Sequence, residues 1–353
     1  MGNTDQKLET LGLEIHKSYF SFKCPIGHGG FGKVWKVEQK KTKQCFAMKE
    51  MNKLRIIRKK SVSSILNERK LLSIIKHPFI VNMQYAFQDK ENLYLVMDLM
   101  TGGDLRYQIS KLRNFSEEQV KFFAACIISG LEYLHLLGII HRDIKPENLV
   151  FDKKGYLRIT DFGIARTIYI ENSKETSGTP GYMAPEVMCS KNHGIAVDYY
   201  ALGVIIYELM KGKRPYIGKN RKEIKMQMLS SQVQLKKSDL PSGWSIESAD
   251  FVNKLLQRKP KNRLGFNGPQ EVKNHVWLSD IHWANLYTKT LKSPFIPLEG
   301  DNFKPTNNFG FKDDLDAFIP LDSVDELFNG YFYNQNIDEC KCDTTQTIKI
   351  RTR

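Results

Sequence analysis

The sequence predicts an α+β protein in which a small strand-rich part precedes a larger helical part. Residues 19–50 alternate polar and apolar side chains and are rich in Phe, Val and Trp, which is typical of strands. Residues 122–140 carry apolar side chains at helical spacing, interrupted by Glu132 and His135, so we expect a buried helix rather than a membrane span. A Gly-rich break at 101–105 marks the expected hinge between the two parts.

The remaining elements follow from local patterns. A helix is expected over residues 60–75, because His77-Pro78 stops it. Roughly the last 65 residues are rich in Asn, Asp and Phe with little periodicity, which favours an extended tail along the body or partial disorder. Short strands are expected at 79–87, 93–99, 149–151 and 157–160, and helices dominate the later part up to about residue 286.

The chain of 353 residues is 41% hydrophobic, which is enough for two folding units. Its net charge of +14 can favour nucleic acid, anionic lipid or acidic proteins. No nucleic-acid-binding motif accompanies the charge, so we expect a solvated basic surface and no nucleic-acid partner. The six cysteines lack zinc-ligand spacing and residues 1–10 are polar, without a signal peptide, which predicts reduced thiols in an intracellular, cytoplasmic protein.

A glycine-rich motif, Gly27-His28-Gly29-Gly30-Phe31-Gly32, lies within the strand-rich part. Such a motif is weak by itself, because dinucleotide-binding folds share it. The dinucleotide version needs a helix directly after the glycines, but Val34-Trp35-Lys36-Val37-Glu38 alternates as a strand. A Gly-rich hairpin folded over phosphates is therefore the better interpretation.

Lys49 ends the strand Ala47-Met48-Lys49, and Glu68 lies in the next predicted helix. A single lysine at such a place is usually a surface residue. With a glycine loop before it and an acid after it, Lys49 becomes a candidate phosphate ligand, and Glu68 is the acid that would hold it toward the phosphates.

Ionisable and amide side chains are concentrated in His141-Arg142-Asp143-Ile144-Lys145-Pro146-Glu147-Asn148, directly after an apolar run. Asp161-Phe162-Gly163 follows shortly afterwards. An aspartate and an asparagine on two neighbouring loops can hold magnesium, and a further aspartate can accept a proton. A polar surface loop is the plain alternative, but both strings match signature motifs of phosphoryl-transfer enzymes.

The ordered set of motifs resembles a eukaryotic protein kinase: glycine loop, A-M-K, helix Glu, H-R-D-x-K-P-E-N, D-F-G, and Ala184-Pro185-Glu186. The resemblance covers residues 20–285. It implies a bilobal protein-kinase fold, with a small β-rich N-lobe that carries one main helix over 20–100 and a large helical C-lobe over 101–285. Residues 1–19 would form a polar N-terminal extension.

The finer resemblance is to the AGC group, through Arg263-Leu264-Gly265, His275-Val276-Trp277 and Pro294-Phe295-Ile296-Pro297. It implies an AGC-type C-terminal tail over residues 286–353. Residues 328–333 are similar to the AGC hydrophobic motif, although Phe332 stands where many members carry a phosphorylatable Ser or Thr. Residues 87–89 and 98–107 are similar to the YANK subfamily.

The resemblance implies a serine/threonine kinase that transfers the γ-phosphoryl group of Mg-ATP to protein hydroxyls. Asp143 would orient or accept the hydroxyl proton, and Lys145 would stabilise the transferring group. Thr179 would touch Asp143. Lys49, held by Glu68, would seat the α- and β-phosphates.

The same resemblance implies a site for ATP with Mg²⁺, in which Asn148 and Asp161 are the metal ligands. Met97 would be the gatekeeper, and Asp104 would bond the ribose. The complete set of implied nucleotide-binding residues is Ile26, Gly27, Gly29, Gly32, Val34, Ala47, Lys49, Met97, Asp98, Met100, Asp104, Asn148, Val150 and Asp161.

Two departures from the family pattern lie elsewhere in the C-lobe. Glu175 stands three residues before Gly178-Thr179-Pro180, where AGC kinases carry an activating phosphosite. We expect Arg142 and Arg166 to reach it, so that its carboxylate partly replaces a phosphate. The alternative is a solvated Glu175, with Thr176, Ser177 or Ser173 as the phosphosite.

The other departure is Tyr200, which replaces the usual Trp of a D-x-W motif, so we expect altered packing rather than lost activity. Glu186 would pair with Arg263. Asp104, Glu147 and Glu208 match acidic positions that AGC kinases use for arginines N-terminal to the target hydroxyl, so a basic preference is predicted there.

Two other classes of function stay open. A pseudokinase scaffold would keep the fold without turnover, although every chemical residue is present. The second class is a basic surface module that could bind an anionic membrane surface or an acidic docking partner. Its residues would be Lys53, Arg55, Arg58, Lys59 and Lys60, and a solvated surface is the plain alternative.

Two further expectations concern the chain as a whole. Gly2 is a candidate for myristoylation, which would attach the chain to a membrane, but Gln6 stands where Ser or Thr is usual. A monomer is expected.

Overall fold

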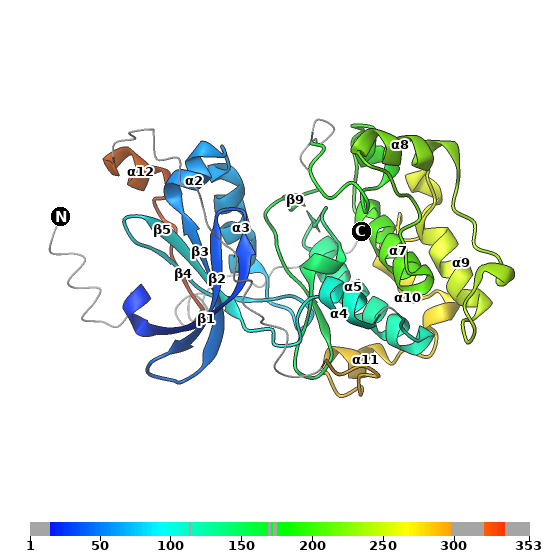
Figure 1. Cartoon of the computed structure of the whole chain (residues 1–353), viewed down its shortest axis with the longest axis horizontal. Helices are drawn as coiled ribbons and strands as arrows, with labels where there is room; N and C mark the ends of the chain where they lie inside the picture. The colour runs from blue at the N-terminus through cyan, green and yellow to red at the C-terminus, as the bar shows by residue number, and fades with distance from the viewer. Residues whose placement is uncertain (1–14, 113, 169–170, 172–174, 298–320, 336–353) are drawn as a thin grey trace, which may run out of the picture. The chain divides into compact units, whose positions relative to one another are not determined.

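The computed structural model describes residues 15–112, 114–168, 171, 175–297 and 321–335. These residues form two compact units (Figure 1). The first contains residues 15–74, 82–99 and 321–335, and the second contains residues 75–81 and 100–297. Within these ranges, no helix combines the length and the apolar content needed to cross a membrane.

The first unit is built on an antiparallel sheet of six strands within the described residues, in the order β1-β2-β3-β5-β4-β10. An aromatic cluster packs on the sheet, in which the Phe87 ring stacks on Phe20 and Tyr94 with centroids 6.1 and 4.9 Å away. The strands are β1 (Phe20–Gly29), β2 (Gly32–Gln39), β3 (Cys45–Asn52), β4 (Met83–Gln88), β5 (Asn92–Asp98) and β10 (Tyr333–Asn334).

Helices α2 (Lys53–Arg58) and α3 (Val62–Ile74) lie beside this sheet (Figure 1). Helix α3 confirms the helix expected over 60–75, whereas α2 was not predicted. The Asn52 side chain caps α2 by accepting the Arg55 backbone N–H at 3.1 Å. The basic residues of this segment concealed the helix, because its buried side chains include Lys53 as well as Ile56.

The strand predicted at 79–87 begins only at Met83. Residues 79–81 belong instead to the second unit, where the Val81 N–H donates to the Ile159 carbonyl at 2.9 Å. Backbone bonding to β8 (Leu157–Ile159) therefore replaces the expected extension of β4.

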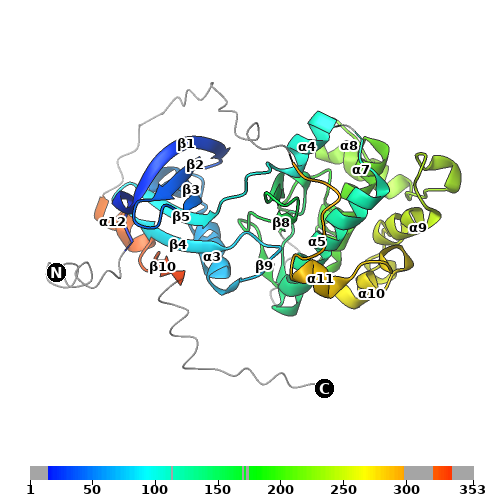
Figure 2. The same cartoon turned by 90° about the horizontal axis from the view of Figure 1, so that it is seen from below.

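Within the tail expected over 286–353, residues 321–335 pack on the first unit, which agrees with a tail along the body, but they form regular elements. They form helix α12 (Leu321–Leu327) and strand β10, which pairs with β4 (Figure 2). Phe328 and Tyr331 are 0% and 2% exposed. Tail residues 298–320 and 336–353 lie outside the described part of the chain.

The second unit is mainly helical and is organised around α5 (Glu117–Leu136) and α7 (Ala196–Lys211). A capping box starts α5, with Ser116 accepting the Gln119 N–H and the Gln119 side chain accepting the Ser116 N–H. Apolar side chains predicted to be buried in α5 are buried, which confirms this helix. The other α-helices are α4 (Leu105–Leu112), α6 (Pro185–Met188), α8 (Arg221–Ser230), α9 (Ile246–Leu255), α10 (Pro269–Lys273) and α11 (Trp283–Tyr287).

Short strand pairs position the loops of the second unit. Strand β6 (Ile139–Ile140) pairs with β9 (Arg166–Thr167), and β7 (Leu149–Phe151) pairs with β8 (Leu157–Ile159). The β7–β8 turn needs glycine at Gly155, because φ is +83° and a Cβ would lie 1.8 Å from the Phe295 carbonyl oxygen. The 3₁₀ segments of the two units are Lys17–Tyr19, Pro146–Asn148, Lys237–Asp239, Pro260–Asn262 and Val276–Leu278.

Candidate active site

The glycine-rich segment forms a hairpin in the first unit, with β1 ending at Gly29 and β2 starting at Gly32. A strand, not a helix, follows the glycines, as the sequence predicted. Gly27 pairs with Val34, which brings the strand of Ile26 beside β2. A Cβ on Gly32 would lie 1.9 Å from the Glu50 carbonyl oxygen, so only glycine allows this close approach of β2 to β3.

Lys49 and Glu68 form an ion pair between β3 and α3. The Lys49 Nζ lies 2.9 Å from Oε1 and 3.2 Å from Oε2 of Glu68. The Glu68 side chain is buried, and that of Lys49 is largely so. Because the Glu68 side chain is buried on α3, its carboxylate holds the Lys49 ammonium group at one position over the sheet.

Three apolar residues of the predicted nucleotide-binding set, Val34, Ala47 and Met97, share one face of this sheet. Ala47 lies opposite Met97, and Val34 lies opposite Lys49, two residues from Ala47. At the end of β5, the Asp98 carboxylate accepts N–H groups of Asn82 at 3.1 and 3.2 Å and of Gln84 at 2.8 Å, which fixes this strand end.

In the second unit, Asp143 is the centre of a hydrogen-bonded group. Its Oδ2 accepts from the Lys145 Nζ at 2.6 Å, and its Oδ1 accepts from the Thr179 backbone N–H and hydroxyl at 3.1 and 3.0 Å. Lys145 also donates to the Thr179 hydroxyl at 2.9 Å. The predicted contact between Thr179 and Asp143 is therefore present, and a cation lies directly beside the carboxylate.

The fully buried Asp198 on α7 supports this loop. Its carboxylate accepts the backbone N–H groups of His141 at 3.0 Å and Arg142 at 2.8 Å, and it contacts the His135 ring at 2.9 Å. Burial alone would raise the pKa of Asp198, but the hydrogen bond and charge of His135 hold the pKa below its usual range. The bonds stabilise an unusual backbone, since Arg142 has φ of +69°.

Asn148 and Asp161 come from neighbouring loops, because the Thr160 N–H donates to the Asn148 carbonyl at 3.0 Å. The Asn148 Nδ2 donates to the Asp143 carbonyl at 2.9 Å, so its amide oxygen is the atom left to bind a cation. Carboxylate and amide oxygens are ligands that Mg²⁺ accepts, and Mg²⁺ in such sites also takes phosphate and water oxygens. Among the described residues, no three His, Cys, Asp or Glu side chains form a metal-binding cluster by themselves.

The other predicted residues of the second unit lie around the start of α4. Asp104 forms a β-bridge with Val150, and its carboxylate accepts the Tyr107 N–H at 2.7 Å. Burial raises the pKa of Asp104 above its ordinary value. Met100, which was predicted to bind the nucleotide, is half-buried four residues before Asp104.

Glu175 lies between two arginines, as predicted. Its carboxylate is 2.5 Å from the Arg142 Nη1 and 3.5 Å from the Arg166 Nε. Burial opposes ionisation, but the hydrogen bond and charge of Arg142, together with Arg166, hold the pKa of Glu175 below its usual range. Thr176 and Ser177 are within the described residues, whereas Ser173 lies outside them.

The three acids predicted to bind substrate arginines are engaged within the chain. Asp104 caps α4, and Arg106 binds the other two: its Nε is 2.9 Å from Glu147 and its Nη1 is 3.0 Å from Glu208. The prediction treated these carboxylates as open, and it missed Arg106. The partners lie 41 and 102 residues from Arg106, so no local pattern would have revealed the contacts.

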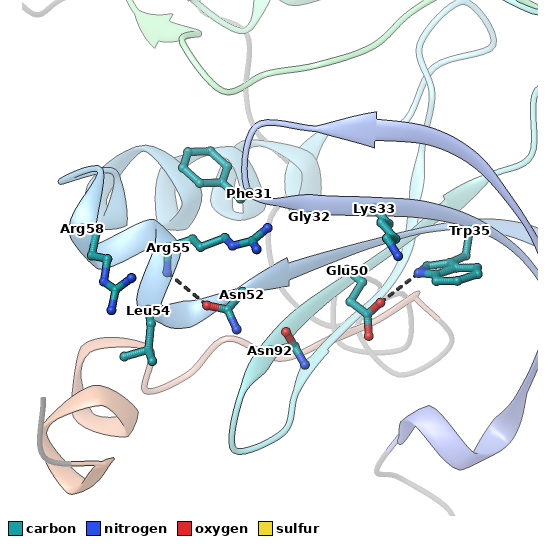
Figure 3. Close-up of a pocket in the computed structure, with 10 residues that line it drawn as sticks. All are labelled: Phe31, Gly32, Lys33, Trp35, Glu50, Asn52, Leu54, Arg55, Arg58 and Asn92. Atoms are coloured by element: carbon teal, nitrogen blue, oxygen red, sulfur yellow. Dashed lines mark hydrogen bonds between the residues drawn. The ribbon is translucent and has the colours of Figure 1, made fainter. Parts of the chain in front are cut away.

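The predicted basic cluster on residues 53–60 is not one surface. Lys53 is 2% exposed and pairs with Asp325 at 2.6 Å, so it is not available to a partner. Lys59 donates to the Gly30 carbonyl at 2.6 Å. Arg55 and Arg58 line a recess of about 320 Å³ together with Lys33 (Figure 3).

Comparison with known proteins gives the same family as the motifs. The model of the protein kinase domain family matches residues 20–278. A probable serine/threonine-protein kinase of Dictyostelium discoideum is 40% identical over 299 residues, which cover 84% of this chain and 64% of the relative. The cAMP-dependent protein kinase catalytic subunit of the same organism is 40% identical over 274 residues, covering 77% and 41%.

Human ribosomal protein S6 kinase alpha-1 is 36% identical over 331 residues, which cover 90% of this chain and 44% of that kinase. The chain thus spans from about two fifths to two thirds of the length of these relatives. The likeness to the YANK subfamily stays a prediction. The similarity to cAMP-dependent and ribosomal S6 kinases agrees with the predicted resemblance to the AGC group, and the chain belongs to the protein kinase family.

Proposed function

We propose that this chain is an active serine/threonine kinase that transfers the γ-phosphoryl group of Mg-ATP to hydroxyls of protein substrates. The group formed by Asp143, Lys145 and Thr179 is the observation that carries this proposal. It combines a proton acceptor and a cation within hydrogen-bond distance of each other, which phosphoryl transfer requires at the attacking hydroxyl.

In this proposal each residue has a separate task. Asp143 orients the substrate hydroxyl and receives its proton, while Lys145 offsets negative charge on the transferring group. Lys49, fixed by Glu68, binds phosphate oxygens beneath the glycine hairpin. When bound by Asn148 and Asp161, Mg²⁺ supplies positive charge to the phosphates.

The proposal is tested with purified protein made in a host without protein kinases. The protein is incubated with radiolabelled ATP, Mg²⁺ and peptides that carry Ser, Thr, Tyr or Ala at the acceptor position. We expect label on the Ser and Thr peptides only, and none after chelation of the metal. Binding of ATP without transfer to any peptide would support the pseudokinase scaffold instead.

We further propose that Glu175 gives the unphosphorylated protein basal activity, because its carboxylate holds Arg142, whose neighbour is Asp143. Replacing Glu175 with Ala removes a charge-assisted contact, so kcat/KM should fall about tenfold. Glu118→Ala removes the same charge from an exposed position of α5 in the same unit and should leave kcat/KM unchanged. Equal rates for wild type and Glu175→Ala would contradict this proposal and favour Thr176, Ser177 or Ser173 as the activating phosphosite.

The pH dependence follows from the lowered pKa of Glu175. A carboxylate with a depressed folded pKa contributes fully above its unfolded pKa of about 4.3 and loses the contribution as the pH falls through the folded value. The ratio of wild-type to Glu175→Ala activity should therefore be constant between about pH 6 and 8.

We propose an acidic docking partner for the recess lined by Lys33, Arg55 and Arg58. Glu50 is the one carboxylate among its lining residues, and it accepts from the Trp35 Nε1 at 2.8 Å (Figure 3). It also pairs with Lys17 at 3.0 Å. A concave basic surface fits a compact acidic group on a peptide better than a flat membrane. Protein substrates with Ser or Thr acceptors, which were also predicted as partners, belong to the proposed kinase function.

This partner is tested by comparing Arg55→Ala/Arg58→Ala with Lys40→Ala/Lys41→Ala, which removes equal charge from exposed positions of the same unit. Affinity for a labelled poly-glutamate peptide should fall about tenfold in the first variant only. Loss of binding to phosphatidylserine vesicles, with peptide binding unchanged, would favour a membrane surface. Equal behaviour of both variants would leave a solvated surface.

An intracellular monomer with reduced thiols completes the proposal. Cys24, Cys45, Cys126 and Cys189 are free thiols among the described residues, which is the expected state in a reducing compartment. The predicted lipid site at Gly2 lies outside the described residues. The preference for basic residues N-terminal to the target stays a prediction. Arg106 already pairs with Glu147 and Glu208, two of the acids on which that prediction rests.

A further inference from the structure

Arg106 is held by two carboxylates from distant parts of the second unit. Its Nε is 2.9 Å from the Glu147 Oε1, and its Nη1 and Nη2 are 3.0 and 3.3 Å from the two oxygens of Glu208. Nη2 also donates to the Tyr182 hydroxyl, which itself donates to Glu208 at 2.6 Å. The guanidinium therefore makes a bidentate pair with Glu208 and a second ion pair with Glu147.

This cluster lies next to the proposed site of transfer. Glu147 is in the same loop as Asp143, four residues later. Tyr182 follows Thr179 by three residues, and the Thr179 hydroxyl is 3.0 Å from Asp143. A peptide that presents a hydroxyl to Asp143 consequently places its neighbouring residues beside these carboxylates.

The burial of Glu208 and the charges of Glu147 and Glu208 show that these two acids require a cationic partner. The Glu208 side chain is 8% exposed, so its carboxylate needs a cationic partner. Partial burial opposes charge on Arg106, but hydrogen bonds to Glu208 and Glu147 raise its pKa and keep it ionised. Arg106 and Glu147 remain 32% and 44% exposed, so an outside guanidinium could reach the same oxygens if Arg106 left.

We propose that Arg106 is a built-in occupant of an arginine subsite formed by Glu147 and Glu208, so that the chain accepts substrates with an uncharged residue at the position this pair would otherwise recognise. The inference rests on the proposed kinase function and replaces the predicted basic preference at this subsite. An intramolecular side chain has an effective concentration of the order of millimolar, so a substrate arginine at micromolar concentration does not displace it.

The test uses Arg106→Met, which keeps the length of the side chain and removes its charge. Ser peptides that carry either Arg or Ala at each position N-terminal to the Ser are compared by kcat/KM. In the wild type the Arg/Ala ratio should be near one at the subsite position. In Arg106→Met it should rise at least about tenfold, because the substrate guanidinium gains the freed charge-assisted bonds.

The matched control is Lys111→Met, which removes one positive charge from an exposed position of α4 and should keep the wild-type ratio. Arg106→Met/Glu208→Gln should also return the ratio toward one, because the subsite then lacks its buried charge. If Arg106→Met does not fold, Arg106→Gln retains amide donors for Glu208 and is measured in its place.

Binding of the same fluorescent peptides, measured by anisotropy without turnover, separates this inference from the proposed function. Tighter binding of the Arg peptide to Arg106→Met, with no phosphoryl transfer by any variant, would support the subsite and contradict the proposed kinase function. An Arg/Ala ratio that is unchanged by Arg106→Met, in binding and in kcat/KM, would overturn the inference. So would a strong arginine preference already present in the wild type and in Arg106→Met alike.

Discussion

Asp143→Asn is expected to lower kcat by about 10²- to 10⁴-fold, because an amide cannot receive the proton of the attacking hydroxyl. Asparagine has nearly the same shape and still offers one oxygen to Thr179 or Lys145. The fold and the affinity for ATP should therefore change little. The measurement is single-turnover transfer of radiolabelled phosphate to a Ser peptide, with ATP binding followed separately.

Asp280→Asn is the control for this variant, because it removes an exposed acid that pairs with Lys121 at 2.9 Å in the same unit. Such surface pairs contribute about 0–1 kcal/mol, so its kcat should equal that of the wild type. Full activity of Asp143→Asn would show that another group takes the proton. Absence of transfer in both the wild type and the variant, with ATP bound by each, would identify a scaffold.

Glu186→Ala is expected to lower the free energy of unfolding by about 3–5 kcal/mol, because it leaves the buried Arg263 guanidinium without its carboxylate. The predicted pair is present: Arg263 Nη1 and Nη2 lie 2.6 and 2.9 Å from the two Glu186 oxygens. The Arg263 side chain is fully buried, so water cannot replace the lost partner. A thermal melt should show a midpoint lowered by roughly 6–20 °C.

Glu132→Ala provides the comparison, since Glu132 pairs with Lys273 at 2.9 Å but both side chains are partly exposed. Its cost should stay below about 1 kcal/mol. Glu186→Leu/Arg263→Met should recover much of the stability, because a buried ion pair can often be replaced by apolar side chains of similar volume. Equal melting points for Glu186→Ala and Glu132→Ala would refute a special role of the buried charge.

Local and periodic features were predictable from the sequence. Helix α5 has repeating apolar positions, and the loop around Asp143 is a dense string of polar residues after an apolar run. The contacts of Thr179 with Asp143 and of Glu175 with Arg142 followed from the resemblance and are present. In each case, the pattern of side chains lies within one short segment or matches a motif of fixed spacing.

Contacts between distant residues that belong to no family motif were missed. Lys53 looked like a surface residue, but its partner Asp325 lies 272 residues away, and the pairing buries the side chain. Tyr200 was expected to alter packing, and the Arg263 guanidinium in fact lies 4.9 Å from its ring centroid. The buried Tyr200 hydroxyl has no hydrogen-bond partner among the described residues. No sequence pattern reports such three-dimensional contacts.

The strand order of the first unit determines when its sheet can be completed during synthesis on the ribosome. Strand β4 ends at Gln88, but its neighbour β10 begins only at Tyr333. At about 5–20 residues per second, the ribosome takes on the order of 10 to 50 s to make the intervening chain. During that interval the nascent sheet has an unpaired β4 edge, and the sites that later enclose Phe328 and Tyr331 are uncovered. The tail thus protects this edge last, after both lobes have left the ribosome.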